Sequence, residues 1–186
     1  MISGPSGSGK TTLARRLLAD KKFAGKLARS VSFTTRPKRP GEKNKKDYYF
    51  VSEKEFKEKL RAKKILEWTK YLGYYYGTAK NFIDRQLRKP KGVILCLDLK
   101  GAKIIRRLYP QSAVTIFVLP PSVVELSRRI RKRSSATKKE EVRKRIRLAR
   151  REISASRAYD YRIANKDLKV ATRGLAAIIN QNLIKS

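Results

Sequence analysis

A complete phosphate-binding pattern near the start of the chain constrains its fold more than any other feature. The pattern G-x-x-x-x-G-K-[ST] is filled by Gly4, Pro5, Ser6, Gly7, Ser8, Gly9, Lys10 and Thr11. Such a loop turns its backbone N–H groups inward around a phosphate, and Cβ atoms at the glycines would obstruct the turn. It leads from a strand into a helix whose positive end faces the same charge. The pattern therefore predicts an α/β fold that holds a nucleoside triphosphate.

Two side chains of this loop carry chemistry. We expect Lys10 to reach the β- and γ-phosphates and Thr11 to ligate Mg²⁺. Thr12 follows in the same turn, and Leu13 and Leu17 have the spacing of a helix, which we place over 10–20. A glycine-rich turn that merely caps a helix is the alternative, and the Lys-Thr pair argues against it.

Later apolar runs indicate further strands and helices of an α/β core. Residues 93–97 and 113–118 are typical of buried parallel strands, while 31–78 breaks the alternation and predicts a mixed β subdomain. We predict one P-loop NTPase-type domain over 1–186, with a parallel sheet, helices on both faces and a helical lid. The expected helices after the loop are 101–108, 122–132 and 168–183. The expected parts are a core of 1–30, 79–125 and 157–186, a subdomain of about 31–78 and a lid of about 126–156.

The composition narrows the chemistry. Histidine is absent, which excludes histidine zinc sites, Ser-His-Asp catalysis and an imidazole general base. A single cysteine excludes an intramolecular disulfide. The chain carries 48 Lys and Arg against 15 Asp and Glu, a formal net charge of +33. We favour a solvated surface, or arginines recruited around phosphate substrates, and leave nonspecific association with polyanions such as nucleic acids open.

The hydropathy pattern bears on location. No uninterrupted apolar run approaches the ~18 residues of a membrane-spanning helix, and no apolar signal segment precedes the loop. We expect a cytoplasmic protein without a membrane partner, either a monomer or a homodimer.

A second set of motifs specifies the phosphate acceptor. Residues 30–42 read S-V-S-F-T-T-R-P-K-R-P-G-E, and residues 47–52 read D-Y-Y-F-V-S. They strongly resemble the guanylate kinase signature, S-V-S-x-T-T-R-x-x-R-x-G-E followed by D-Y-x-F-V-S. Further matches at 67–68, 75–78, 97–101 and 120–122 occur in the family order, so the resemblance covers essentially the whole chain. It implies transfer of the γ-phosphoryl group of Mg·ATP to GMP, and to dGMP, in purine metabolism.

The resemblance also implies how guanine is bound. Guanine presents adjacent N1–H and N2–H donors that Glu67 can accept together, while the hydroxyls of Ser32 and Thr78 can donate to O6. Asp98 belongs to the same set. Cys96 stands where many family members carry an acidic residue, so the contacts would rely more on Glu67; packing is the role that we favour for the thiol.

The other implied contacts are with phosphates and adenine. Arg36 and Arg39 would clamp the acceptor phosphate, since guanidinium forks match phosphate oxygens, with the hydroxyls of Tyr48 and Tyr76 beside them. Glu42 and Gly77 complete the implied GMP-binding set. On the donor side the resemblance implies that lid residues Arg129, Arg133 and Arg145 contact the ATP phosphates and the transferring group, and that Asn165 lies near adenine.

The lid register stays open by one residue, because the alignment through 134–139 needs an insertion, and the polar 134–136 predicts a break between two helices. An ionised phosphate oxygen is already a nucleophile, so the implied reaction needs no general base.

Two alternatives remain. One is a guanylate-kinase-like scaffold domain that binds phosphopeptides without catalysis, although such domains have eroded loops and this chain keeps Lys10 and Thr11. The other is a related P-loop kinase with a different phosphorylated acceptor, which the thiol at Cys96 motivates.

Overall fold

A computed structural model describes residues 1–89, 91–133 and 139–183, without the side chains of Arg133 and Lys139. The chain forms two compact units: a first unit of Met1–Ala24 with Cys96–Ser186, and a second unit of Gly25–Leu95. The second unit contains the predicted subdomain 31–78 and extends beyond it at both its N-terminal and its C-terminal end. The reason is that a strand before this segment pairs with a strand after it.

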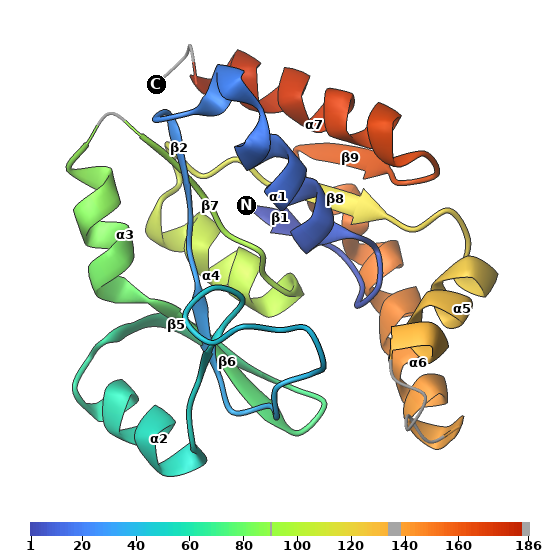
Figure 1. The fold of residues 1–186 in the computed structure, drawn as a ribbon, viewed down its shortest axis with the longest axis horizontal. Helices are drawn as coiled ribbons and strands as arrows, with labels where there is room; N and C mark the ends of the chain where they lie inside the picture. Colours follow the sequence, from blue (N-terminus) through green and yellow to red (C-terminus); the bar gives the residue numbers. More distant parts are fainter. Residues whose placement is uncertain (90, 134–138, 184–186) are drawn as a thin grey trace. The chain divides into compact units, whose positions relative to one another are not determined.

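The first unit is built on a parallel sheet of three strands in the order β1 (Ile2–Ser3), β8 (Ile116–Leu119) and β9 (Tyr161–Ala164) (Figure 1). The central strand β8 pairs with both neighbours, and its residues 116–118 are completely buried. A strand covered on both faces reads as a continuous apolar run, which is why this segment was recognisable in the sequence.

Five helices of this unit are described, and the four predicted from the sequence start and end within two residues of their predicted bounds. They are α1 (Lys10–Ala19), α4 (Leu99–Leu108), α5 (Val123–Arg133), α6 (Lys139–Ser154) and α7 (Leu168–Leu183), with 3₁₀ turns at Lys21–Phe23 and Ala155–Ala158. Helices α1 and α7 lie side by side (Figure 1). No helix in the described ranges combines the length and the apolar character that crossing a bilayer requires.

Helices α5 and α6 occupy the predicted lid and pack on each other through a small apolar cluster. It comprises Leu126, Ile130, Val142 and Ala149, with Ile146 packed against it. The predicted break at 134–136 lies outside the described residues.

The second unit carries two sheets and two helices. Strands β2 (Leu27–Arg29) and β7 (Gly92–Ile94) form a parallel pair. The larger sheet has the order β4 (Tyr49–Phe50), β3 (Ser32–Thr34), β6 (Tyr74–Ala79) and β5 (Ile65–Tyr71), and the helices are α2 (Glu53–Arg61) and α3 (Lys80–Leu87). Because β3 pairs parallel with β4 and antiparallel with β6, this sheet confirms the predicted mixed β subdomain.

Helix α2 begins at a capping box and covers one face of the mixed sheet. The Ser52 hydroxyl accepts the Glu55 N–H at 3.1 Å, and the Glu55 carboxylate accepts the Ser52 N–H at 2.6 Å. Phe56 is completely buried and stacks on Tyr75 with ring centroids 5.3 Å apart. A Cβ at Gly77 would lie 3.0 Å from the Phe56 ring, so glycine lets the helix approach β6 closely.

Candidate functional site

The phosphate loop of the first unit connects β1 to α1 in a conformation that requires glycine. Gly4 and Gly9 have φ values of 140° and 100°. A Cβ at Gly4 would lie 2.4 Å from the Val118 carbonyl oxygen, and one at Gly9 would lie 2.2 Å from Asn165 Nδ2. No side chain of the described residues caps the first turn of α1. Its first N–H groups are therefore available to bind an anion.

Polar contacts within the first unit hold this loop in shape. Lys10 Nζ donates to the carbonyl oxygens of Gly4 at 2.5 Å and Pro5 at 3.0 Å. Asn165 is 4% exposed, and its Nδ2 donates to the Ser8 carbonyl at 2.8 Å. The amide of Asn165 thus supports the phosphate loop, and its contact with adenine stays a prediction. Thr11 lies half-buried in the first turn of α1, followed by the exposed Thr12.

Two of the predicted lid arginines lie beside this loop. Arg145 Nη1 donates to Ser6 Oγ at 3.3 Å, and its side chain is 11% exposed. Arg129 Cβ lies 3.9 Å from the position that a Cβ at Gly7 would take. The third, Arg133, ends α5, and its side chain lies outside the described part of the structure.

Each of these two arginines is held by a carboxylate one helical turn earlier. Glu141 accepts from Arg145 Nε at 3.0 Å and Nη2 at 2.5 Å, and Glu125 accepts from Arg129 Nε at 2.9 Å. Hydrogen bonds from Arg128 and Arg129 lower the pKa of Glu125 to about 2. The sequence analysis did not identify either carboxylate. The signal that could have found them is the spacing of four residues from Glu to Arg, which favours an ion pair on a helix.

A buried carboxyl group on α6 was also missed, and no sequence pattern marked it. Glu152 is 8% exposed, and its Oε2 has no hydrogen-bond partner within the described ranges. Burial raises the pKa of Glu152 to about 7; the Lys10 ammonium opposes this rise and the Asp98 carboxylate adds to it. Burial thus leaves the first unit with a carboxyl group whose pKa lies near neutral pH.

Asp98 and Cys96 belong to the first unit. Asp98 caps α4 by accepting the Gly101 N–H at 2.8 Å, and the half-buried Cys96 forms a parallel bridge with Ile2. Their contacts with guanine stay predictions.

The residues of the second unit that are predicted to contact guanine gather on one face of the mixed sheet. Ser32 pairs with Thr78 in the register of β3 and β6, and directly paired residues share a face. Thr78 Oγ1 donates to Glu67 Oε1 at 2.6 Å, with Thr78 completely buried and Glu67 5% exposed. Because the hydroxyl has one proton, Thr78 orients Glu67 here and does not donate to a third group at the same time.

The expected phosphate clamp lies in the same unit. Arg36 is 6% exposed, its Nη2 donates to both carboxylate oxygens of Glu42 at 2.8 and 3.0 Å, and its guanidinium lies 5.5 Å from the centre of the Tyr48 ring. The Tyr48 and Tyr76 rings meet edge to face at 6.0 Å. The Arg39 backbone N–H donates to Glu42 at 2.9 Å. Arg36, Glu42, Tyr48 and Tyr76 are therefore brought together as one cluster.

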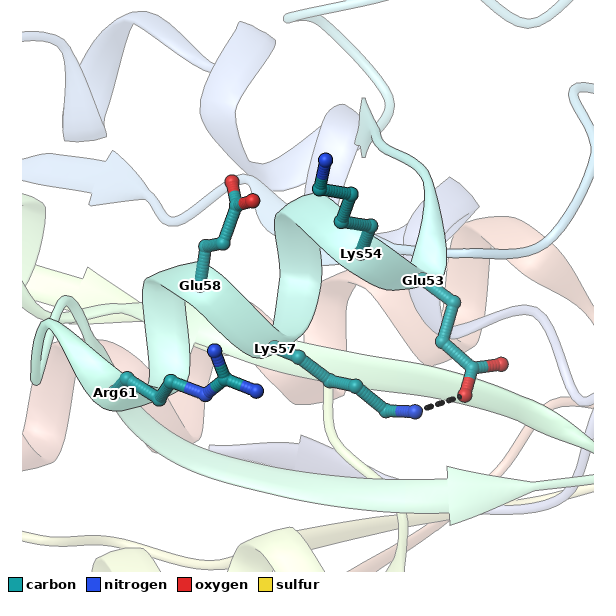
Figure 2. Close-up of a pocket in the computed structure, with 5 residues that line it drawn as sticks. All are labelled: Glu53, Lys54, Lys57, Glu58 and Arg61. Carbon is teal, nitrogen blue, oxygen red and sulfur yellow. Dashed lines mark ion pairs between the residues drawn. The ribbon is translucent and has the colours of Figure 1, made fainter.

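A hollow lies over α2 (Figure 2). It is lined by Glu53, Lys54, Lys57, Glu58 and Arg61, all exposed. Lys57 pairs with Glu53 at 2.7 Å, and both side chains are more than half exposed. Ion pairs of this kind contribute little stability, and no predicted site residue lines the hollow.

Comparisons with known proteins point to one family. The model of the family described as guanylate kinase matches residues 1–182. The chain is 40% identical to a guanylate kinase of Wolbachia pipientis over all of its length and 90% of that protein, and 43% identical to one of Thermosynechococcus vestitus over 96% and 91%. The crystal structure of guanylate kinase from Anaplasma phagocytophilum has a TM-score of 0.81 at 31% identity, covering 100% of this chain and 85% of that one. The resemblance and the predicted fold class are confirmed: the chain belongs to the guanylate kinase family.

Proposed function

We propose that this chain is an ATP:GMP phosphotransferase, which moves the γ-phosphoryl group of ATP to GMP or dGMP and yields ADP and GDP or dGDP. The observation that carries the proposal is the buried Glu67–Thr78 pair on the acceptor face, at 2.6 Å. A buried carboxylate is costly unless polar partners compensate it. Adjacent N–H donors of guanine would supply such partners, and adenine would present an unprotonated ring nitrogen instead.

Discrimination between guanine and adenine follows from this pair. Thr78 donates to one oxygen of Glu67 and so orients the carboxylate toward N1–H and N2–H. In this proposal the hydroxyl of Ser32, on the strand paired with that of Thr78, donates to O6. A base that left these groups unpaired would bind far more weakly, on the order of 10⁴-fold for a site built on buried polar groups.

Arg36 is the main cation for the acceptor phosphate in this proposal. Glu42 occupies one edge of its guanidinium through two hydrogen bonds and also accepts the Arg39 N–H. A carboxylate and a phosphate repel each other, so Glu42 serves to orient Arg36 and does not itself bind the phosphate. The hydroxyls of Tyr48 and Tyr76 supply neutral donors beside the guanidinium.

The donor side stabilises the charge that spreads over the transferring group. Backbone N–H groups of residues 6–11 and the Lys10 ammonium would surround the phosphates of ATP, and Arg129 and Arg145 would contact them from the lid. An ionised phosphate oxygen of GMP is the nucleophile, so the absence of histidine from the sequence is no obstacle. The side chains contribute positions and charges, and no protein group needs to remove a proton.

Mg²⁺ fits this donor set. In the described residues no group of three or more acidic, cysteine or histidine side chains could hold a metal by itself. Mg²⁺ in kinases is bound largely through substrate phosphates, so the Thr11 hydroxyl in the first turn of α1 would supply the protein contact. When bound, the metal would neutralise charge on the β- and γ-phosphate oxygens.

The alternatives with other functions are less well supported. A non-catalytic domain would not need the glycine conformations and Lys10 contacts of an intact phosphate loop. A different phosphorylated acceptor would not need a buried carboxylate oriented by a hydroxyl.

An acceptor panel tests the proposal. ADP release from Mg·ATP is measured with GMP, dGMP, AMP, UMP and ribose 5-phosphate at equal concentrations. We expect GMP and dGMP to be strongly preferred, and we expect Glu67→Gln to reduce the preference for GMP over AMP by at least about tenfold, as loss of a charged hydrogen-bond partner would. Absence of GMP-dependent turnover would refute the proposal that the chain is an enzyme. A preference for ribose 5-phosphate over GMP would show that the acceptor is a sugar phosphate.

We also place the protein in the cytoplasm, where ATP and GMP are metabolised, as a monomer or a homodimer. Light scattering on the purified chain tests the oligomeric state.

A further inference from the structure

Helix α6 presents arginines on two different sides. Its inner side carries Val142, Arg145 and Ala149, of which Arg145 contacts the phosphate loop. Its other side carries four exposed arginines at positions i, i+4, i+7 and i+8, a spacing that places them on one helical face. These four, here called the outer face of α6, are Arg143, Arg147, Arg150 and Arg151.

The four arginines of the outer face have no ion-pair or hydrogen-bond partner for their side chains in the part of the chain that the structure describes. Their neighbours do: Lys144 pairs with Glu140 at 3.0 Å, and Arg145 with Glu141 at 2.5 Å. Like charges one turn apart destabilise a helix. The outer face therefore keeps a repulsion that carboxylates relieve elsewhere on the same helix.

The residue type and the spacing favour phosphate groups as the missing partners. A lysine would serve solubility equally well, whereas the guanidinium fork binds phosphate oxygens through two parallel hydrogen bonds. With a rise of ~1.5 Å per residue, the face extends over about 12 Å from Arg143 to Arg151. A duplex of that length carries about seven phosphates, so several of the four arginines can each contact a different one.

We propose that the outer face of α6 binds the phosphate backbone of nucleic acids. A lipid surface fits less well, because helices that lie on membranes insert large apolar side chains. The exposed large apolar residues of the described ranges, such as Trp68 and Val170, all lie on other elements. The exposed surface of α2 differs in kind, since its basic residues alternate with Glu53 and Glu58 (Figure 2). Binding is independent of base sequence because only backbone contacts are offered.

The experiment compares two variants that each remove four positive charges, from +33 to +29. The test variant replaces the four outer-face arginines of α6 with Gln, a good helix former. The control variant replaces four exposed basic residues of α4 and α7 with Gln. These control positions are Lys103, Arg107, Lys169 and Arg173. Fluorescence anisotropy follows the binding of labelled 20-base-pair DNA and RNA duplexes between 50 and 200 mM salt, and GMP-dependent turnover verifies that each variant is folded.

We expect the test variant to bind at least about tenfold more weakly than the control at 50 mM salt. Its dependence of log K on log salt should be shallower by about 3 to 4, since each lost phosphate contact removes ~0.9 from the slope. If DNA and RNA duplexes bind with equal affinity, the ligand is the phosphate backbone that they share. A preference for one of them identifies that nucleic acid as the ligand.

Three results would overturn the proposal. The first is an equal loss of duplex affinity in the test and control variants, which would mean that binding depends on the net positive charge of the whole chain. The second is an unchanged salt slope in the test variant. The third is α6-dependent binding to phosphatidylglycerol vesicles without binding to either duplex. If the fourfold variant does not fold, the double variants at Arg143 with Arg147 and at Arg150 with Arg151 should each show about half of the slope change.

Discussion

Replacement of Glu152 by Gln should make the protein more stable at pH 8 and leave its stability at pH 4.5 nearly unchanged. Burial raises the pKa of this carboxyl group from 4.5 to about 7 in the native state. Each pH unit of that rise corresponds to about 1.4 kcal/mol, so ionised Glu152 costs the native state about 3 kcal/mol relative to an exposed carboxylate. Gln occupies the same space without an ionised form.

The direction follows from where the proton is bound. Well below pH 4.5 the group is protonated in both states, and above about pH 8 it is largely ionised in both. Between these limits the native state holds the proton more tightly than the unfolded state, so the contribution of Glu152 to the free energy of unfolding falls as the pH rises. The difference between variant and wild type should therefore grow from near zero to about 3 kcal/mol across this window.

Urea unfolding followed by circular dichroism at pH 4.5, 6, 7 and 8 measures this difference. Other titrating groups are common to both proteins and cancel. Glu140→Gln is the matched control, since Glu140 lies on the same helix with a side chain that is 76% exposed. A difference between Glu152→Gln and wild type that stays constant with pH would refute the reasoning, as would an equal pH dependence in the control.

Three further predictions concern catalysis. Glu141→Gln should lower kcat about tenfold, because Arg145 loses its orienting partner. The control Glu140→Gln should leave kcat unchanged. In an Arg145→Ala background Glu141→Gln should cause no further loss of kcat, and an additive loss would contradict the orienting role. Thr78→Val should raise KM for GMP by about 10- to 100-fold through loss of the hydrogen bond that orients Glu67, the carboxylate proposed to bind guanine. Thr78→Ser keeps a hydroxyl and should keep KM close to the wild-type value; equal KM values for the two variants would contradict this. Lys10→Ala should abolish turnover and leave GMP binding, measured by calorimetry, largely intact; loss of GMP binding would contradict the division into donor and acceptor sides.

The sequence was most informative where one interaction dominates a short segment. The glycines at Gly4 and Gly9 are required by the turn itself, and the apolar run of β8 follows from burial on both faces. Both features are local and were predicted correctly. Helix α2 was missed although Ser52 and Glu55 form a capping box, because the aromatic residues around it suggested only strands.

What the sequence could not supply depends on contacts between distant residues. The burial of Glu152 results from the packing of α6, and a glutamate in a helix rich in charge is ordinarily exposed. The donation from Thr78 to Glu67 depends on the pairing of β5 with β6 and on an irregular register between Ile65 and Trp68. A residue type and its spacing predict that such groups share a face, and they do not determine which atom donates to which.

The bond from Asn165 to the Ser8 carbonyl joins residues 157 positions apart in the chain. Eight consecutive letters near the start of the sequence are enough to recognise the phosphate loop, yet part of its shape is supplied by a strand end made much later in synthesis. During synthesis the motif is therefore complete long before the site is. A fragment that ends ahead of β9 would carry every letter of the pattern and lack one of the hydrogen bonds that hold it ready for a phosphate.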